Sequence, residues 1–362
     1  MNKLDPRNIY DDLHQIPELG FEEFKTSAYL ADKLEAMGYK VTRNIGGTGV
    51  IGEIKGSEPG PVMMLRADMD ALPFLIDGEK KNIHACGHDA HSAMLLAAAS
   101  ELVGKVKRGT LRILFQQGEE TLKGALAVID AGVIEDVDIA LGLHIRPVQD
   151  IAYGEMSPAV RHASSTFVNV VINGLSSHGA RPHLGVNAIE AAAVAINAIT
   201  AIKINPIIPW SCKVTGIKGG GVAPNIIPDK VEMIVDARAQ TNEAMTELLE
   251  KLRRAVTNAA AALGATAGGV IPAAEYDDEL TAEVAECIVE VVGEEKLAKE
   301  LVNPGGEDFH YFVNKYPHIK AAYFGVGAAA APGLHHQDMQ LNKEALPSGT
   351  AVLVKMVERK LG

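Results

Sequence analysis

One short segment of the chain concentrates side chains that bind metal ions or carry protons. It reads His84-Ala85-Cys86-Gly87-His88-Asp89-Ala90-His91, and the glycine permits a turn sharp enough for Cys86 and His88 to face one point. A buried cysteine beside surface histidines at a helix start would give the same letters. The segment alone therefore leaves a metal site and a structural role open, and residues elsewhere in the chain must decide between them.

Further candidates follow apolar runs that are typical of buried strands. Glu119 and Glu120 follow one such run, His144 follows another, and His335 lies near the C-terminus. Taken alone, the glutamate pair could be a solvated surface dipeptide, and His144 could be a partly buried histidine with its hydrogen bonds satisfied. Their shared position after strand-like runs favours metal binding and proton transfer.

The first part of the chain alternates strand-like and helical runs. Strands are expected at 40–43, 49–54, 62–65, 110–115 and 139–143, and helices within 7–38 and at 89–103. This order predicts an α/β fold, a mostly parallel sheet with helices on both faces. Ligands bind beyond the carboxyl ends of such strands, which is where Asp68, Glu119, Glu120 and His144 fall. Asp68 and Asp70 could orient a histidine ligand from behind or cap the next segment, and both roles stay open.

The pattern changes from about residue 161. The order becomes β-α-β-β-α-β, with strands at 165–173, 210–217, 231–238 and 267–272 and helices at 186–203 and 242–264. This order is typical of a ferredoxin-like α+β unit. We therefore predict an inserted domain at 161–274 within a metal-binding domain formed by 1–160 and 275–362. After the insertion, a strand at 320–325 and helices at 280–293 and 344–360 rejoin the first sheet.

The inserted domain contributes three further candidates. His178 lies in a loop between glycine and serine residues, Asn225 follows a triple-glycine turn, and Arg238 ends a strand. His178 could be an exposed loop histidine or a donor that stabilises an oxyanion. Arg238 could be only a surface charge.

Composition narrows the class of protein. The 362 residues carry a formal net charge of -12, which argues against nucleic-acid binding because phosphate neutralisation needs a basic face. Three widely spaced cysteines fit a reducing compartment. The charged N-terminal segment is unlike a signal peptide, and the apolar runs are too short to span a membrane. We expect a cytoplasmic protein with no membrane partner.

The candidate ligands are more numerous than a single ion with an open position requires. Thiolate sulfur, imidazole nitrogen and carboxylate oxygen suit zinc and similar first-row ions, and two ions that share a bridging ligand would use all five candidates. These are Cys86, His88, Glu120, His144 and His335. Glu119, next to a ligand, would then be free to accept a proton from water. This arrangement predicts hydrolysis of a carbonyl compound.

Seven motifs occur in an order that resembles one family. They are HACGHDAH, LFQQGEE, GLHIRP, SSHGARPH, GGGVAPNIIPD, GGEDF and GLHH. Together they resemble the metal-dependent aminoacylase and carboxypeptidase superfamily, in its branch of hippurate hydrolases, auxin-conjugate hydrolases and N-acetyl-diaminopimelate deacetylases. The resemblance spans nearly the whole chain. It differs in a short segment at 73–84, where relatives generally carry a longer loop, and in Gln117-Gly118 where Pro-Ala is common.

The resemblance implies roles for individual residues. The five ligand candidates match a two-metal site with Cys86 in the bridging position, and Glu119 matches the general base. His178 and Asn225 match residues that hold the scissile carbonyl, and Arg238 resembles an arginine that receives the substrate carboxylate. The inserted domain would be a lid through which subunits dimerise.

We therefore expect a metal-dependent amidohydrolase that releases a carboxylate and a free amino acid from an N-acyl amino acid. The expected cofactors are two divalent ions, zinc or manganese, with cobalt and nickel also suited to the donors. A dipeptidase or carboxypeptidase using the same site is one alternative. A metal-dependent binding protein without turnover is another, which the presence of Glu119 argues against.

Overall fold

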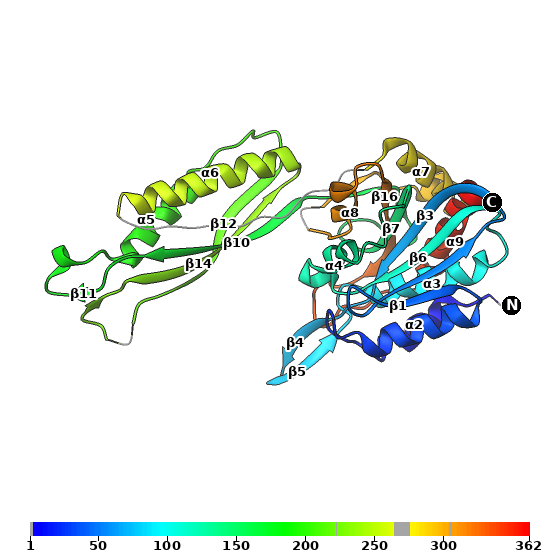
Figure 1. The fold of residues 1–362 in the computed structure, drawn as a ribbon, viewed down its shortest axis with the longest axis horizontal. Helices are drawn as coiled ribbons and strands as arrows, with labels where there is room; N and C mark the ends of the chain where they lie inside the picture. Colours follow the sequence, from blue (N-terminus) through cyan, green and yellow to red (C-terminus); the bar gives the residue numbers. More distant parts are fainter. Residues whose placement is uncertain (1–2, 222, 264–275, 304–305) are drawn as a thin grey trace. The chain divides into compact units, whose positions relative to one another are not determined.

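The computed structural model describes residues 3–221, 223–263, 276–303 and 306–362, and it divides into two compact units (Figure 1). Unit 1 comprises residues 1–161, 275–301 and 307–362, and unit 2 comprises residues 162–274 and 302–306. The strand expected at 267–272 lies outside the described residues.

Unit 1 is built around a seven-stranded sheet with the order β1-β2-β6-β3-β7-β16-β8. The strands are β1 (Lys40–Ile45), β2 (Gly49–Lys55), β3 (Glu58–Asp68), β6 (Arg108–Gln116), β7 (Ile139–Pro147), β8 (Met156–Ser157) and β16 (Lys320–Ala330). The four central strands β6, β3, β7 and β16 are parallel to one another, and the pairings toward both edges are antiparallel. The prediction of an α/β fold with a mostly parallel sheet is confirmed, and the antiparallel pairings toward the edges make the sheet mixed.

Helices cover both faces of this sheet. One face packs against α1 (Pro6–His14), α2 (Phe24–Ala36), α3 (His88–Leu102), α7 (Asp278–Val292) and α9 (Leu346–Leu361). The other face packs against α4 (Gly124–Asp130) and α8 (His310–Lys315). Side chains of β3 alternate between these layers, because Met63 and Leu65 join the first core and Met64 joins the second. The alternation explains why the strand is buried on both faces from Met63 to Asp68, where Arg66 and Asp68 are the charged members of an otherwise apolar run.

The carboxyl ends of the parallel strands carry the polar candidates. Asp68 pairs with Gln116 across β3 and β6, and His144 on β7 pairs with Gly325 on β16. A short 3-10 turn, η1 (Glu119–Thr121), follows β6. The strand alternation thus places these segments at one edge of the sheet, as expected for a parallel sheet.

A hairpin at 72–83 was not expected from the sequence. It pairs β4 (Leu72–Ile76) with β5 (Glu79–Ile83). Its turn residues Asp77 and Gly78 both have positive φ, 53° and 82°, the combination that a type I′ hairpin turn requires. The short segment before the metal-binding motif is therefore an ordered hairpin.

Unit 2 has a three-stranded antiparallel sheet with the order β10-β14-β12. The strands are β10 (Ser164–Asn173), β12 (Trp210–Gly219) and β14 (Lys230–Ala239), and one face packs against α5 (Ala188–Thr200) and α6 (Asn242–Ala261). A small pair joins β11 (Ser177–His178) to β13 (Ile226–Ile227). The inserted α+β unit expected from the sequence is present in these elements.

The remaining elements are short. They are β9 (Val160–His162), β15 (Leu301–Asn303), η2 (Pro182–Leu184), η3 (Glu294–Lys296) and η4 (Lys343–Ala345). Within the described ranges, we find no helix with the length and apolar character needed to span a membrane.

Candidate metal centre

Cys86 and His88 are held on opposite sides of a left-handed glycine. Gly87 has φ +87° and precedes the first turn of α3. A Cβ atom there would lie 2.4 Å from Cδ1 of Ile145, so both the backbone angle and the available space require glycine. Cys86 and His88 are buried, at 6% and 0% exposure. The sharp turn predicted from the sequence thus directs both side chains into the protein.

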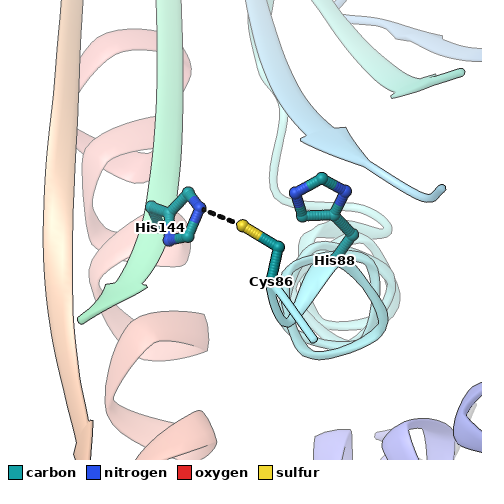
Figure 2. Close-up of side chains that lie close together, drawn as sticks. All are labelled: Cys86, His88 and His144. Atoms are coloured by element: carbon teal, nitrogen blue, oxygen red, sulfur yellow. Dashed lines mark hydrogen bonds between the residues drawn. The ribbon is translucent and has the colours of Figure 1, made fainter. Parts of the chain in front are cut away.

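Four candidate ligands converge on a fifth, Cys86, and the five come from four segments of the chain. Cys86, His88 and His144 form one donor group, and Cys86, Glu120 and His335 form a second, with all ligand atoms in each group within 4.8 Å of one another. Figure 2 shows the Cys86 thiol between the two imidazoles of the first group, with its Sγ 3.4 Å from Nε2 of His144. On the other side, Nε2 of His335 lies 3.3 Å from the same Sγ and 3.3 Å from Oε1 of Glu120. A thiolate shared by two donor groups is the arrangement expected of a bridging ligand.

Hydrogen bonds made by Nδ1 fix the orientation of two imidazoles. Nδ1 of His88 is 3.0 Å from Oδ1 of Asp70, and Nδ1 of His144 is 2.6 Å from the carbonyl oxygen of Ile145. Both contacts place the ring proton on Nδ1 and leave the Nε2 lone pair pointing to the donor group. Nε2 of His88 is buried and has no hydrogen-bond partner among the described residues. A metal ion would satisfy this nitrogen.

The electrostatics of the centre also fit a cation. Burial, followed by the charge of Glu120, raises the pKa of the Cys86 thiol well above its usual range. Burial, followed by the charges of His91 and Arg146, lowers the pKa of His144 well below its usual range and keeps this imidazole neutral. A neutral imidazole is the ligand form, and a bound cation would favour the thiolate that burial disfavours. The donor set therefore fits two divalent ions.

Asp68 and Asp70 have different partners. Asp70 hydrogen-bonds His88 through Oδ1 and accepts the backbone N–H of Glu120 through Oδ2, both at 3.0 Å. Asp68 lies 2.6 Å from Nδ1 of His91 and 2.7 Å from the Arg66 guanidinium. Of the two carboxylates, Asp70 is the one that hydrogen-bonds a candidate ligand, whereas Oδ1 of Asp68 lies 3.9 Å from the same Nδ1 of His88. Neither side chain caps α3.

The carboxylates of Glu119 and Glu120, on the turn after β6, both approach His88. Oε2 of Glu119 lies 3.9 Å and Oε1 of Glu120 lies 3.8 Å from Nε2 of His88, and Glu120 also faces Cys86 and His335. Burial, followed by the charges of Glu307 and Glu120, raises the pKa of Glu119 well above its usual range. A carboxylate with a raised pKa can hold a proton near neutral pH, as a general base must between taking and delivering it.

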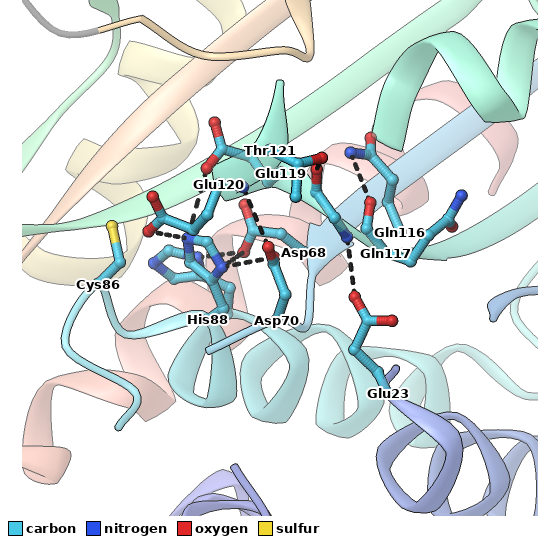
Figure 3. A network of polar contacts seen from close by, with 12 residues as sticks. Glu23, Asp68, Asp70, Cys86, His88, Gln116, Gln117, Glu119, Glu120 and Thr121 are labelled. Atoms are coloured by element: carbon cyan, nitrogen blue, oxygen red, sulfur yellow. Dashed lines mark hydrogen bonds and ion pairs between the residues drawn. The ribbon is translucent and has the colours of Figure 1, made fainter. Parts of the chain in front are cut away.

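A buried ionic cluster behind Glu119 was not predicted from the sequence. The Arg66 guanidinium is fully buried and contacts Asp68, Asp308 and Glu307 at 2.7, 2.7 and 3.1 Å. Gln116 donates a hydrogen bond to Asp308. Figure 3 shows Asp68 of this cluster beside His88, Asp70 and the Glu119-Glu120 pair. The available signal was the charged pair Arg66 and Asp68 at the end of an apolar strand, where burial is costly unless partners exist.

The candidates in unit 2 separate into two places. His178 and Asn225 lie side by side, because His178 pairs with Ile226 and the Gly179 N–H donates to the carbonyl of Asn225 at 2.7 Å. Both are exposed. Arg238 lies near the far end of β14 and contacts Asp236 at 3.0 Å, about 25 Å along the strand from its Lys230 end at the usual rise per residue. Unit 2 by itself thus brings His178 and Asn225 together and holds Arg238 apart.

Comparison with known proteins gives one consistent result. A family model described as peptidase family M20/M25/M40 matches residues 64–359. Thermostable carboxypeptidase 1 of Saccharolobus solfataricus is 34% identical over 335 residues, which cover 87% of this chain and 84% of that protein. N-acetylcysteine deacetylase of Bacillus subtilis is 31% identical over 362 residues, covering 94% and 92%.

A solved structure agrees with these sequence relatives. The Bacillus subtilis YxeP protein, described as a dinuclear metal binding peptidase from the M20 family, superimposes with a TM-score of 0.79 at 29% identity and covers 98% of this chain and 97% of that one. The match to the family model includes the HACGHDAH segment, the Glu119-Glu120 pair and His335. The resemblance inferred from the motifs is confirmed, and the chain belongs to the M20/M25/M40 peptidase family of metal-dependent hydrolases.

Proposed function

We propose that this chain is an amidohydrolase that cleaves N-acyl amino acids into a carboxylate and a free amino acid. The observation that carries the proposal is the Cys86 thiol shared by two donor groups, with the Glu119 carboxylate beside them. Hydrolysis of an amide needs an activated carbonyl, a water molecule and a group that moves its proton. The deacetylase relative supports an N-acyl amino acid as the substrate class.

The proposed cofactors are two divalent ions, zinc or manganese, with cobalt and nickel as other ions suited to the donors. The residues that would hold them are Cys86, which both donor groups share, together with His88, Glu120, His144 and His335. When bound, such ions polarise a carbonyl and lower the pKa of water. Glu119 accepts the proton of the attacking water and delivers it to the leaving nitrogen, a role supported by its burial and raised pKa.

Other residues complete the proposed site. Asp68 contributes indirectly, by holding His91 and Arg66 behind the ligands. In unit 2, we assign carbonyl binding and oxyanion stabilisation to His178 and Asn225, and binding of the substrate carboxylate to Arg238, because the family resemblance gives these positions such roles. Their test is a rise in KM or a fall in kcat when each is replaced by alanine.

The decisive experiment measures amine release from N-acyl amino acids by metal-stripped protein before and after addition of zinc, manganese or cobalt. We expect activity to return with metal and to be nearly lost in Glu119→Ala, although that variant still binds metal. Glu53→Gln is the control, because it alters a half-buried carboxylate of the same unit that pairs with Arg112 at 2.7 Å. Wild-type turnover in Glu119→Ala would remove its assignment as the base.

A peptidase function is the second candidate. It is supported by the carboxypeptidase relative at 34% identity. Both functions use the same centre, so the substrate panel must separate them. Acetyl and benzoyl amino acids should be cleaved faster than dipeptides if the amidohydrolase proposal is right, and the opposite order would favour the peptidase.

We further propose that the protein is a cytoplasmic homodimer or higher homo-oligomer that associates through unit 2. Cys86, Cys212 and Cys287 are free thiols, which supports a reducing compartment. Among the described residues, β12 lies at one edge of the unit 2 sheet, and such a strand offers unpaired backbone groups to a second copy. Light scattering would measure the assembly, and a monomer at micromolar concentration would contradict the proposal.

A further inference from the structure

The N-terminal part of the chain holds a buried carboxylate that the proposed chemistry does not use. Glu23 immediately precedes α2 and has 0% exposure. Its Oε1 accepts the backbone N–H of Gly118 at 2.8 Å, and its Oε2 accepts the hydroxyl of Thr48, which is also buried. Burying a carboxylate is costly unless strong hydrogen bonds compensate. The contact with Gly118 is therefore the feature that needs an explanation.

Gly118 begins the turn that carries Glu119 and Glu120. Its φ is +62°, and a Cβ atom there would lie 2.6 Å from the ring of Phe21. A glycine in this conformation has more freedom than any other residue, so the turn depends on outside contacts for its position. Figure 3 shows Glu23 pointing toward this turn from the side opposite Cys86.

The segment just before Glu23 packs against this turn and against Asp70, the carboxylate that supports it. A Cβ atom at Gly20 would lie 2.9 Å from Cα of Gly118 and 3.3 Å from Oδ2 of Asp70. Phe21 has a φ of +68°, which is strained for a residue with a side chain. Asp70 in turn accepts the N–H of Glu120. Residues 20–23 thus touch the turn itself and the carboxylate that holds it.

Three buried carboxylates from distant segments each accept one backbone N–H of residues 118–125. Glu23 accepts from Gly118 at 2.8 Å, Asp70 from Glu120 at 3.0 Å and Asp308 from Ala125 at 2.8 Å. Asp70 also contacts His88, and Asp308 also contacts Arg66. Glu23 differs from these two, since its other side-chain partner among the described residues is the uncharged hydroxyl of Thr48.

We propose that Glu23 is a positioning residue that holds Glu119 and Glu120 in place through the Gly118 amide. The inference deepens the proposed function, because it takes Glu119 as the base and Glu120 as a ligand. A displacement of about 1 Å in a catalytic group can reduce turnover by about 100-fold. Loss of an outer hydrogen bond to a metal site typically reduces affinity or activity by about 10- to 100-fold.

The test compares Glu23→Ala with Glu23→Gln in the full chain. Alanine removes the acceptor, and we expect kcat to fall by about 10- to 100-fold with a smaller change in KM, at saturating metal and with wild-type metal content. Glutamine keeps one oxygen for the Gly118 N–H and offers its amide group to Thr48, so it should restore most of kcat. The absorption spectrum of the cobalt-loaded protein should shift in the alanine variant and match wild type in the glutamine variant.

Glu18→Ala is the matched control for lost stability. The Glu18 carboxylate accepts the N–H groups of Lys25 and Thr26, both at 2.9 Å, at the start of α2. Removing it should lower Tm while leaving kcat and the cobalt spectrum unchanged. Equal kcat losses in Glu18→Ala and Glu23→Ala, or an unchanged kcat and spectrum in Glu23→Ala, would overturn the proposal.

The experiment also separates this inference from the proposed function. If wild-type protein binds metal but cleaves no N-acyl amino acid, the proposed function fails, whereas the cobalt spectra still report whether Glu23 positions the turn. A spectrum that changes in Glu23→Ala and returns in Glu23→Gln would support the positioning role under either outcome. Identical spectra in all variants would remove it.

Discussion

Replacing Asp70 by asparagine should weaken one metal site by changing which nitrogen of His88 carries the proton. In the native protein, Oδ1 of Asp70 contacts Nδ1 of His88 and Oδ2 accepts the N–H of Glu120. The asparagine side chain has one carbonyl oxygen, which accepts hydrogen bonds, and one NH2 group, which donates them. Because a backbone N–H can only donate, Glu120 takes the oxygen, and the amide group faces His88. His88 must then accept at Nδ1 and carry its proton on Nε2, the nitrogen that faces the metal.

The expected loss of metal affinity follows from the conflict between the tautomer that asparagine favours and the tautomer that binds metal. Metal binding requires the opposite tautomer, which would set the Nδ1 proton of His88 against the amide protons of the new side chain. A hydrogen bond that involves a charged group contributes about 1.5–3 kcal/mol. This loss corresponds to about 10- to 100-fold weaker binding of the ion that His88 holds. The second ion, on the side of His335, should be affected less.

The assay is competition for metal against a coloured chelator, which reports the two binding steps separately. Asp138→Asn is the control, because Oδ2 of Asp138 accepts the backbone N–H of Val62 at 2.8 Å without a histidine partner. An asparagine oxygen can keep that bond, so both affinities should be retained. Two sites of wild-type affinity in Asp70→Asn, in a folded protein, would refute the tautomer argument.

Three further predictions concern folding. Gly87→Ala should lower the stability of metal-free protein by about 2–4 kcal/mol in urea unfolding, because a left-handed alanine is strained and its Cβ displaces Ile145. Arg66→Met should cost about 3–5 kcal/mol in the same assay, since it leaves buried carboxylates without their cation. The hydrogen bond that the His14 ring donates to the Asp89 carboxylate raises the pKa of His14. The Tm loss in His14→Gln should therefore be largest below about pH 6.5 and vanish as pH rises through the folded pKa. A pH-independent Tm loss, or unchanged stability in either of the other variants, would contradict these arguments.

Much of the fold follows from strand and helix periodicity. The alternation of elements predicts parallel strands, and parallel strands bring Asp68, the Glu119-Glu120 pair and His144 to one edge because their carboxyl ends coincide. The position of His335 is different in kind. It follows the last strand by several residues with φ +61°, and its N–H donates to the carbonyl of Ala85. Such a loop contact has no periodic signal. The sequence offered His335 as a ligand candidate by its residue type and its place near the C-terminus, and the family resemblance then matched it to the two-metal site.

The features missed from the sequence depend on register or on loop geometry. The hairpin at 72–83 had a usable signal, since Asp77-Gly78 is a preferred type I′ turn pair. No comparable signal in the sequence decides whether Asp68 or Asp70 hydrogen-bonds the ligand histidine. Residues two apart point the same way along a strand, and which one meets His88 depends on β3 ending at Asp68. The carboxylates around Arg66 likewise include one from a distant segment, since Asp308 lies 242 residues from Arg66 in the sequence.

The carboxylates that hold the Glu119 turn also set its chemistry. Asp308 accepts the N–H of Ala125 at the start of α4, and its charge, with that of Glu307, contributes to the raised pKa of Glu119. Position and proton affinity of Glu119 are therefore not independent, since both depend on the cluster around Arg66. Glu23 fixes the other end of the same turn. It follows that a variant at Asp308 should change both the rate and the ionisation of Glu119, whereas a variant at Glu23 should act on position alone.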